Sequence, residues 1–265
     1  MSLCPSSHYP SGSAAQLASR ILPLIDLTSL NSDDTDAVIR HLCRQAVTPR
    51  GSTAAVCVYP PFIDVAKREL ASLGARVKVA TVTNFPAGEA NIALAVAQTR
   101  EAVAAGADEV DLVFPYEALR EGDERLGLSM VQQCRQICGP EVTLKVIIES
   151  GELEGHLLIR RASKLAIAGG ADFIKTSTGK VAVNATPEAA RVMLEAIKEC
   201  GKPVGFKAAG GIRTVTEAAQ YLALADEIMG AGWATPATFR FGASSLLGDV
   251  LCALGIDTSA TAGAY

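Results

Sequence analysis

The chain has 265 residues, of which 49% are hydrophobic and 20% are charged, and its formal net charge is −4 at pH 7. This length and apolar content suit one soluble domain with a large core, because α/β barrels often run to about 250 residues. The mild acidity, without a basic stripe, argues against nucleic acid as a partner.

The N-terminal segment, residues 1–20, contains Ser, Pro and Gly but lacks a basic start followed by an apolar run, so it does not resemble a secretory signal. We expect it to be a flexible arm. No segment approaches the roughly 20 consecutive apolar residues of a membrane helix, which argues against a membrane partner. The seven cysteines are odd in number and spread through predicted core elements, a usage that fits a cytoplasmic protein better than a disulfide framework.

Short β-rich runs alternate with helical stretches along the chain. Eight runs are predicted as strands: 21–26, 54–60, 77–85, 109–115, 143–149, 172–178, 204–210 and 240–244. One intervening helix is expected to begin after Thr186, with Pro187 at its first position, and to end at Gly201. Another begins where Thr214 and Glu217 have the spacing of a capping box.

Eight such units predict a single α/β domain over residues 21–256, folded as a closed (β/α)8 TIM barrel, better than an open doubly wound sheet. Residues 104–114 and 168–178 align as a repeated unit, and the first strand-to-helix connections lack the glycine fingerprint of a dinucleotide site. Residues 257–265 are expected to form a mobile C-terminal tail.

Polar residues late in the strands are candidates for a functional site, because barrel enzymes place their chemistry at the carboxyl ends of the strands. Six predicted strands contain one such residue each: Asp26, Cys57, Asp111, Lys145, Lys175 and Lys207. The structural alternative is that these are core charges paired with one another. As a set on one barrel they are expected to converge on one pocket.

Lysines in such a pocket indicate Schiff-base chemistry, because a neutral amine attacks a carbonyl and the resulting imine draws electrons from the neighbouring carbon. An ordinary lysine, with a pKa of about 10.4, is almost fully protonated at pH 7. A second ammonium about 4 Å away contributes about 4 kcal/mol at an effective dielectric of 20, and partial burial adds to this. Lys207 is the expected neighbour of Lys175, while Asp111 is expected to carry protons, to pair with the lysine charges, or both.

Glycine and hydroxyl clusters at three consecutive strand ends predict a phosphate site; they span residues 177–180, 209–211 and 242–245. Barrel enzymes often bind phosphate there with the N-terminus of a short extra helix, for which residues 244–254 are the candidate. We expect no metal, because His8 lies in the arm, His41 and His156 lie in separate predicted helices, and Cys134 and Cys138 have no matching ligand pair.

At these residues the sequence resembles the deoxyribose-phosphate aldolases, class I aldolases that form a Schiff base, and most closely their bacterial enterobacterial-type branch. The resemblance runs from about Leu22 to Tyr265 and rests on six motifs in family order: VTNFPAG, EVDLVFPY, TLKVIIE, ADFIKTSTGKVAVNATPE, VGFKAAGG and FGASSLL. It implies a lyase without cofactor or metal that reversibly cleaves 2-deoxy-D-ribose 5-phosphate to acetaldehyde and D-glyceraldehyde 3-phosphate.

The resemblance also implies residue roles. Lys175 would form the Schiff base, Lys207 would perturb it and transfer protons, and Asp111 would complete the relay. The substrate-binding residues would be Asp26, Thr28, Cys57, Lys145, Thr178, Gly179, Lys180, Gly210, Gly211, Ser244, Ser245 and Tyr265. Two other functions stay open: a Schiff-base aldolase or transaldolase for another sugar phosphate, and a non-catalytic phosphosugar-binding barrel. A homodimer and a monomer are both compatible with the sequence.

Overall fold

The computed structural model describes residues 13–256, which contain a closed barrel of eight parallel strands. The strands follow one another around the barrel in chain order, and the first pairs with both the second and the last. They are β1 (Ile25–Thr28), β4 (Ala55–Val58), β5 (Lys78–Thr83), β6 (Glu109–Val113), β7 (Thr143–Ile147), β8 (Phe173–Lys175), β9 (Gly205–Ala209) and β10 (Phe239–Ala243). The predicted (β/α)8 TIM barrel is confirmed, and each predicted strand overlaps one strand of the barrel.

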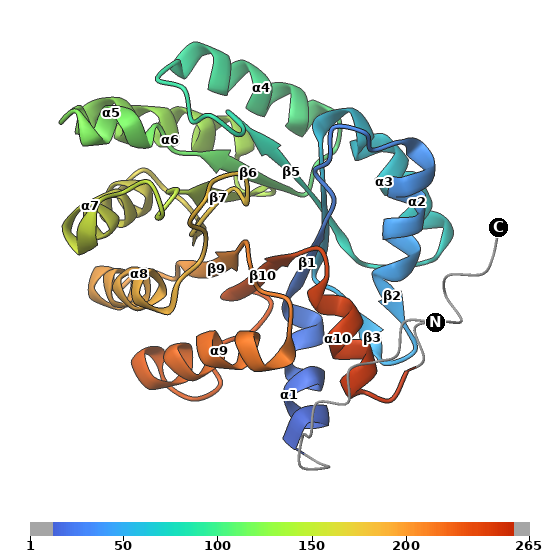
Figure 1. The fold of residues 1–265 in the computed structure, drawn as a ribbon. Helices are drawn as coiled ribbons and strands as arrows, with labels where there is room; N and C mark the ends of the chain where they lie inside the picture. The colour runs from blue at the N-terminus through green and yellow to red at the C-terminus, as the bar shows by residue number, and fades with distance from the viewer. Residues whose placement is uncertain (1–12, 257–265) are drawn as a thin grey trace.

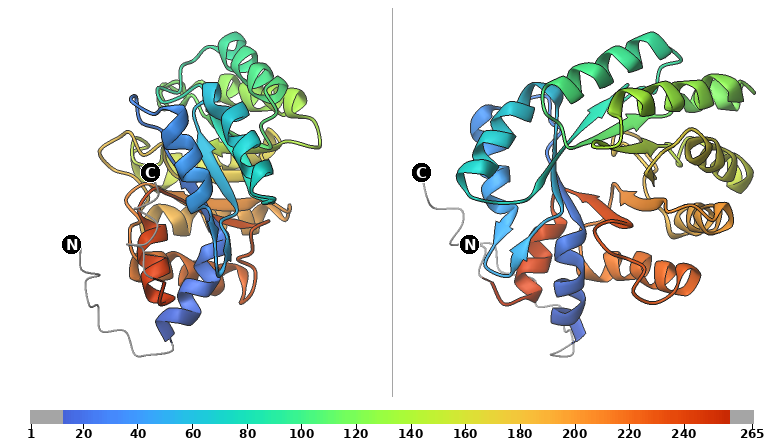
Figure 2. Two further views of the ribbon diagram at one scale, coloured as in Figure 1. Left: turned by 90° about the vertical axis from the view of Figure 1, so that its right-hand side faces the viewer. Right: turned by 180° about the vertical axis from the view of Figure 1, so that it is seen from behind.

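Helices connect the strands and surround the barrel (Figure 1). They are α1 (Ser13–Ile21), α2 (Asp36–Gln45), α3 (Ile63–Ser72), α4 (Ile92–Ala104), α5 (Tyr116–Arg120), α6 (Glu124–Cys138), α7 (Gly155–Ala168), α8 (Pro187–Cys200), α9 (Val215–Met229) and α10 (Leu246–Ala253), with 3-10 turns η1 (Leu22–Leu24) and η2 (Pro60–Phe62). Seen from behind in Figure 2, α10 lies beside α1, so the two ends of the described chain meet on one side of the barrel.

The local helix signals act as the sequence predicts. Thr186 caps α8 by accepting a hydrogen bond from the Ala189 backbone N–H, and Gly201 ends the helix in the left-handed region at φ 63°. Thr214 and Glu217 form a complete capping box at the start of α9. Each cap satisfies backbone donors that the first turn of a helix leaves without an intrahelical partner.

The N-terminal region differs in part from its prediction. Residues 13–20 belong to helix α1, whereas we expected a flexible arm over residues 1–20, and residues 1–12 lie outside the described part. The first strand begins only at Ile25, because η1 with its proline occupies the start of the predicted run. A short hairpin of β2 (Val47–Thr48) and β3 (Gly51–Ser52) was not predicted, since two-residue strands are too short to show alternation. The predicted tail over 257–265 also lies outside the described residues.

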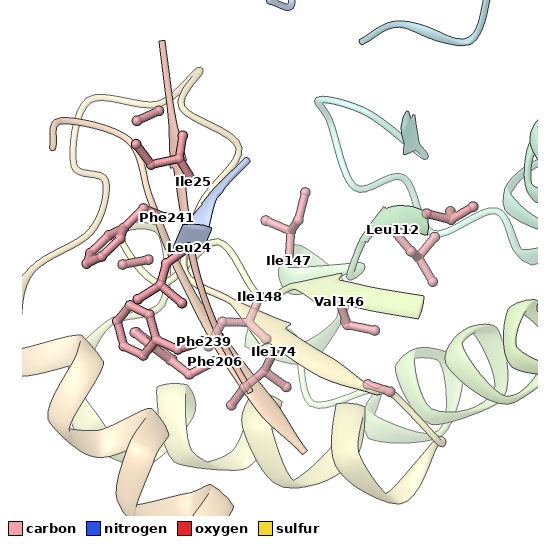
Figure 3. Close-up of a cluster of buried hydrophobic side chains, with 14 of the residues drawn as sticks. Leu24, Ile25, Leu112, Val146, Ile147, Ile148, Ile174, Phe206, Phe239 and Phe241 are labelled. Carbon is pink, nitrogen blue, oxygen red and sulfur yellow. The ribbon is translucent and has the colours of Figure 1, made fainter. Parts of the chain in front are cut away.

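Strand alternation divides the side chains between the barrel interior and the layer under the helices. In β10, Phe239 and Phe241 point outward, and Phe241 packs edge-on against Tyr221 of α9 at a centroid distance of 6.5 Å. Figure 3 shows Phe206, Phe239 and Phe241 gathered in this outer hydrophobic cluster. Arg240 therefore points inward, because successive residues of a strand face opposite sides.

The interior of the barrel has an apolar part and a charged part. Leu30, which follows β1, forms a separate buried cluster with side chains of β4 and β5: Ala55, Cys57, Ala80 and Val82. The remaining strands direct buried charged groups inward, as described below. No helix among residues 13–256 is long and apolar enough to cross a membrane.

Candidate active site

Three lysines and an aspartate on the neighbouring strands β6 to β9 gather inside the barrel. The strand register pairs Asp111 of β6 with Lys145 of β7, and Lys175 of β8 with Lys207 of β9. All four residues are buried, with 3% of Lys175 exposed and none of the other three. Side chains along a strand point alternately to its two faces, and these four point inward, so their polar ends meet inside the barrel. The structure thus brings together these four predicted residues.

The Asp111 carboxylate is the centre of this group. Its Oδ2 lies 2.8 Å from Nζ of Lys175 and 2.8 Å from Nζ of Lys207, and its Oδ1 lies 2.8 Å from Nζ of Lys145. One carboxylate therefore accepts hydrogen bonds from three amines. Such charge-assisted bonds are stronger than neutral ones, and they hold the three amino groups in fixed positions.

A second layer of charges lies beneath, formed by Asp26 of β1, Glu109 of β6 and Arg240 of β10. Arg240 Nη1 lies 2.6 Å from Asp26 Oδ1, and its Nη2 lies 2.9 Å from Glu109 Oε1. Asp26 also accepts a hydrogen bond from Lys207, and Glu109 Oε2 lies 2.6 Å from Lys145 Nζ. Asp26 and Glu109 thus tie this layer to the lysines above.

The two layers together contain four basic groups and three acidic groups. In their ordinary ionised forms they carry a net charge of +1, and deprotonation of one lysine makes the buried set neutral. Lys145 contacts three carboxylates and Lys207 contacts two, whereas Lys175 shares a single oxygen of Asp111 with Lys207. Lys175 has the fewest acidic partners, so its proton is the least strongly held.

The pKa shifts of the lysines follow these contacts. Burial lowers the pKa of Lys175 below its usual value; Asp111 opposes that change and the Lys207 ammonium adds to it. Burial also acts against the charge of Lys207, but Asp111 and Asp26 outweigh it and raise its pKa. Asp111 and Glu109 raise the pKa of Lys145 in the same way. Lys175 is therefore the lysine suited to act as a nucleophile, with burial a larger cause than the neighbouring charge that the sequence suggested.

The acids and the thiol of the interior have matching shifts. Burial alone would raise the pKa of Asp111, but Lys145, Lys175 and Lys207 lower it well below its ordinary value, so this carboxylate is ionised. The pKa of Asp26 is lowered by Lys207 and Arg240, which outweigh its burial. Burial raises the pKa of the Cys57 thiol, which stays neutral.

A cavity of about 260 Å³ opens above Lys175. It is lined by residues of several strand ends: Thr28, Leu30, Asn31, Lys175, Thr178, Gly179, Lys180, Ala209, Gly210, Gly211, Ile212, Arg213, Gly242, Ala243, Ser244 and Ser245. The three predicted phosphate clusters line this cavity with every residue except Ser177, and Thr28 lines it too. Lys175 is the one member of the buried charge network among them, so a molecule in the cavity reaches that amine first.

The glycines of the cavity wall allow a backbone that other residues would strain. Gly179, Gly210 and Gly211 have φ of 83°, 87° and 84°, in the region that L side chains rarely adopt. A Cβ on Gly210 would also lie 2.6 Å from Cβ of Asn184, so the loop after β8 packs directly on the loop after β9. Gly242 leaves room for Lys207, whose Cε would lie 3.0 Å from an added Cβ.

The far side of the cavity has features suited to an anion. Ser245 is the N-cap residue of α10 and lines the cavity, so the N-terminus of this helix lies at the cavity wall. The Ser245 side chain makes no capping hydrogen bond. Helix N-termini favour negative charge. Lys180 donates a hydrogen bond to the Leu30 carbonyl at 2.6 Å, and Arg213 adds a second basic side chain to the wall.

Glu149, directly after β7, supports the loop that carries Thr178. Its backbone has φ 52°, uncommon outside glycine, and its carboxyl group is fully buried. The Thr178 backbone N–H lies 3.2 Å and 3.3 Å from its two carboxyl oxygens. Burial raises the pKa of Glu149. The carboxyl group thus anchors the turn before Gly179.

Four residues of the site were not identified from the sequence: Glu109, Glu149, Arg213 and Arg240. Glu109 and Arg240 are charged residues inside predicted core strands, the same signal that identified the three lysines, and it was available for them too. Tyr265 lies outside the described residues, and within the described part no cluster of His, Cys, Asp and Glu has the arrangement of a metal site.

Comparisons with known proteins agree with this architecture. The model of the DeoC/LacD family aldolases matches residues 20–249. A candidate deoxyribose-phosphate aldolase from Toxoplasma gondii, solved in its apo form, is 26% identical with a TM-score of 0.84, over 93% of this chain and 99% of its own. A candidate deoxyribose-phosphate aldolase from Coccidioides immitis is 27% identical (TM-score 0.76; 91% and 88% covered). A deoxyribose phosphate aldolase from Aeropyrum pernix, described as a unique tetramer, is 26% identical (TM-score 0.71; 92% and 93% covered).

Proposed function

The chain belongs to the DeoC/LacD family of aldolases, and from this we propose that it cleaves 2-deoxy-D-ribose 5-phosphate reversibly to acetaldehyde and D-glyceraldehyde 3-phosphate through a Schiff base on Lys175. The observation that carries the proposal is the position of Lys175. It is the buried lysine with a lowered pKa, and it is the one that lines the cavity. The names of the structural neighbours support the choice of substrate.

In the cleavage direction, the neutral Nζ of Lys175 attacks the aldehyde carbon of the open-chain sugar and forms a carbinolamine, which loses water to give an iminium ion. A base removes the proton of the hydroxyl on the third carbon, and the bond between the second and third carbons breaks. Its electron pair moves into an enamine on Lys175, and D-glyceraldehyde 3-phosphate leaves. Protonation of the enamine and addition of water release acetaldehyde and the free amine.

The proton transfers are assigned to Asp111 and Lys207. Asp111 lies within hydrogen-bond range of the reacting amine, and it links that amine to Lys207, since its Oδ2 is 2.8 Å from each of the two lysine nitrogens. Lys207 is held protonated by two carboxylates and can give a proton that Asp111 helps to return. On the other side, the loops around Gly179, Gly210 and Ser245 would hold the phosphate, with Lys180 nearby.

Reductive trapping tests the proposal. The protein is incubated with acetaldehyde and cyanoborohydride, and peptide mass analysis locates the N-ethyl-lysine that reduction of the imine leaves. The expected result is modification at Lys175, and modification confined to Lys207 would refute the assignment. Lys175→Met should abolish trapping, whereas Lys164→Met, on the exposed face of α7, serves as the matched control.

Tests of substrate acceptance distinguish the proposed function from the two alternatives. An enzyme for 2-deoxyribose 5-phosphate accepts acetaldehyde as donor and fails with dihydroxyacetone phosphate. An aldolase for a longer ketose phosphate does the opposite, and a transaldolase rejects acetaldehyde and takes its three-carbon donor unit from a ketose phosphate. A non-catalytic barrel would be stabilised by the sugar phosphate without forming product. The cysteine usage supports a cytoplasmic location, and the sequence motifs support the enterobacterial-type branch. Light scattering tests whether the protein is a homodimer.

A further inference from the structure

Glu109 and Arg240 form a buried ion pair that the proposed reaction does not use directly. Arg240 contacts Glu109 through Nη1 at 3.1 Å and through Nη2 at 2.9 Å, and its Nε donates to the Pro236 carbonyl at 2.6 Å. The two residues are 3% and 6% exposed, and neither lines the cavity. Burying such a pair carries a desolvation penalty that an apolar pair would avoid, so the site retains these charges at a cost.

Each member of the pair also contacts one further group of the buried charge network. Glu109 Oε2 lies 2.6 Å from Nζ of Lys145, and Arg240 Nη1 lies 2.6 Å from Oδ1 of Asp26, whose other oxygen accepts from Lys207. Glu109 therefore stabilises the protonated form of Lys145. Arg240 orients the Asp26 carboxylate that supports the proton of Lys207.

Lys175 receives no such support. The titratable and charged groups that act on it are Asp111 of β6, Lys207 of β9, Cys57 of β4 and Glu149 after β7. Among these, Asp111 is its salt-bridge partner and shares the bonded oxygen with Lys207. We propose that Glu109 and Arg240 are positioning residues: their contacts fix Lys145 and Asp26, and their opposite charges set how readily Lys175 gives up its proton. This rests on the Schiff-base function proposed above.

Because the buried set carries a net charge of +1 when Lys175 is protonated, removing one member changes the reactivity of Lys175 in a direction set by the sign of that member. Arg240→Met removes a cation, which favours the protonated form of Lys175. Its trapping with acetaldehyde should then begin at a pH about one unit higher than in the wild type. Glu109→Gln removes an anion with little change of shape, and the onset should move to a pH about one unit lower.

The experiment measures the rate of imine trapping at Lys175 as a function of pH in the full chain. Three further variants provide controls. Arg240→Lys keeps the charge and should leave the onset in place, and so should Arg191→Met, which removes an exposed arginine on α8 paired with Glu227. The double variant Glu109→Gln/Arg240→Met restores the net charge, so its onset should return to within about half a unit of the wild type.

Opposite shifts for the two single variants, cancelled in the double variant, support the proposal. Shifts in the same direction, or none in variants that retain the native circular dichroism spectrum, overturn it, because a purely structural pair would lower the rate without moving the onset by charge sign. If Arg240→Met does not fold, Glu109→Gln and the double variant decide the matter, because their expected onsets differ by about one unit. Absence of trapping in the wild type would instead refute the proposed function itself.

Discussion

Replacing Lys207 by Met should raise the pH at which Lys175 becomes reactive. Both amine nitrogens lie 2.8 Å from Asp111 Oδ2, so they are at most twice that distance, 5.6 Å, apart. Two unit charges about 5.6 Å apart repel by about 3 kcal/mol at an effective dielectric of 20, which corresponds to about two pKa units. Methionine keeps an unbranched side chain of similar length but removes the charge. The carboxylates of Asp26 and Asp111, relieved of one cation, would favour the protonated form of Lys175 still more.

The assay is the pH dependence of reductive trapping at Lys175 with acetaldehyde. The lowered pKa of Lys175 in the wild type places the onset of reaction below the ordinary lysine range, and in Lys207→Met we expect it about two units higher. Below the onset, the trapping rate should therefore fall about 100-fold. Lys164→Met removes an exposed lysine and should show the wild-type onset. An unchanged onset in Lys207→Met would refute the view that Lys207 lowers the pKa of Lys175, whatever its effect on turnover.

Three further predictions concern the cavity and its supports. Lys180→Met should raise KM about tenfold for the phosphorylated substrate. An equal rise in KM for unphosphorylated 2-deoxyribose would place Lys180 away from the phosphate. Gly210→Ala combines a φ of 87° with a clash against Asn184 and should lower the free energy of unfolding by about 2–4 kcal/mol in urea titrations. Gly248→Ala, in α10 with open space around it, is the control and should be neutral or slightly stabilising. An equal loss of unfolding free energy in both variants would contradict the role of the clash and the positive φ at Gly210. Thr186→Ala should cost about 1 kcal/mol by loss of the α8 cap, while Thr186→Ser should retain most of it.

The barrel and the convergence of the lysines could be predicted from the sequence because both follow from local rules. Alternating strands and helices indicate a parallel barrel, and polar residues late in its strands must point inward and meet. Lys175 and Lys207 lie in register on neighbouring strands for this reason. The helix limits at Thr186 and Gly201 depend only on nearby residues, so they too could be located.

What the sequence could not show is which group contacts which. Glu109 and Arg240 are 131 residues apart along the chain, and only closure of the barrel brings them into contact. The same holds for the number of carboxylates around each lysine, which distinguishes Lys175 from Lys145. The sequence also suggested that the Lys207 charge is the main influence on Lys175, whereas the barrel interior makes burial the larger one.

The balance of buried charge explains how one lysine can react while its neighbours stay protonated. The set is neutral when Lys175 has lost its proton, and in the proposed reaction it would regain a charge of +1 when an iminium ion forms there, beside the Asp111 carboxylate that faced the ammonium. The site therefore alternates between a neutral and a +1 state that the same contacts stabilise, while Lys145, Lys207 and Arg240 stay protonated between turnovers. Lys207 is less suited to be the nucleophile, because two carboxylates stabilise its protonated form and it does not line the cavity. Lys175 thus combines the fewest carboxylate contacts with direct access to the cavity, and each of these two properties separately favours it as the nucleophile.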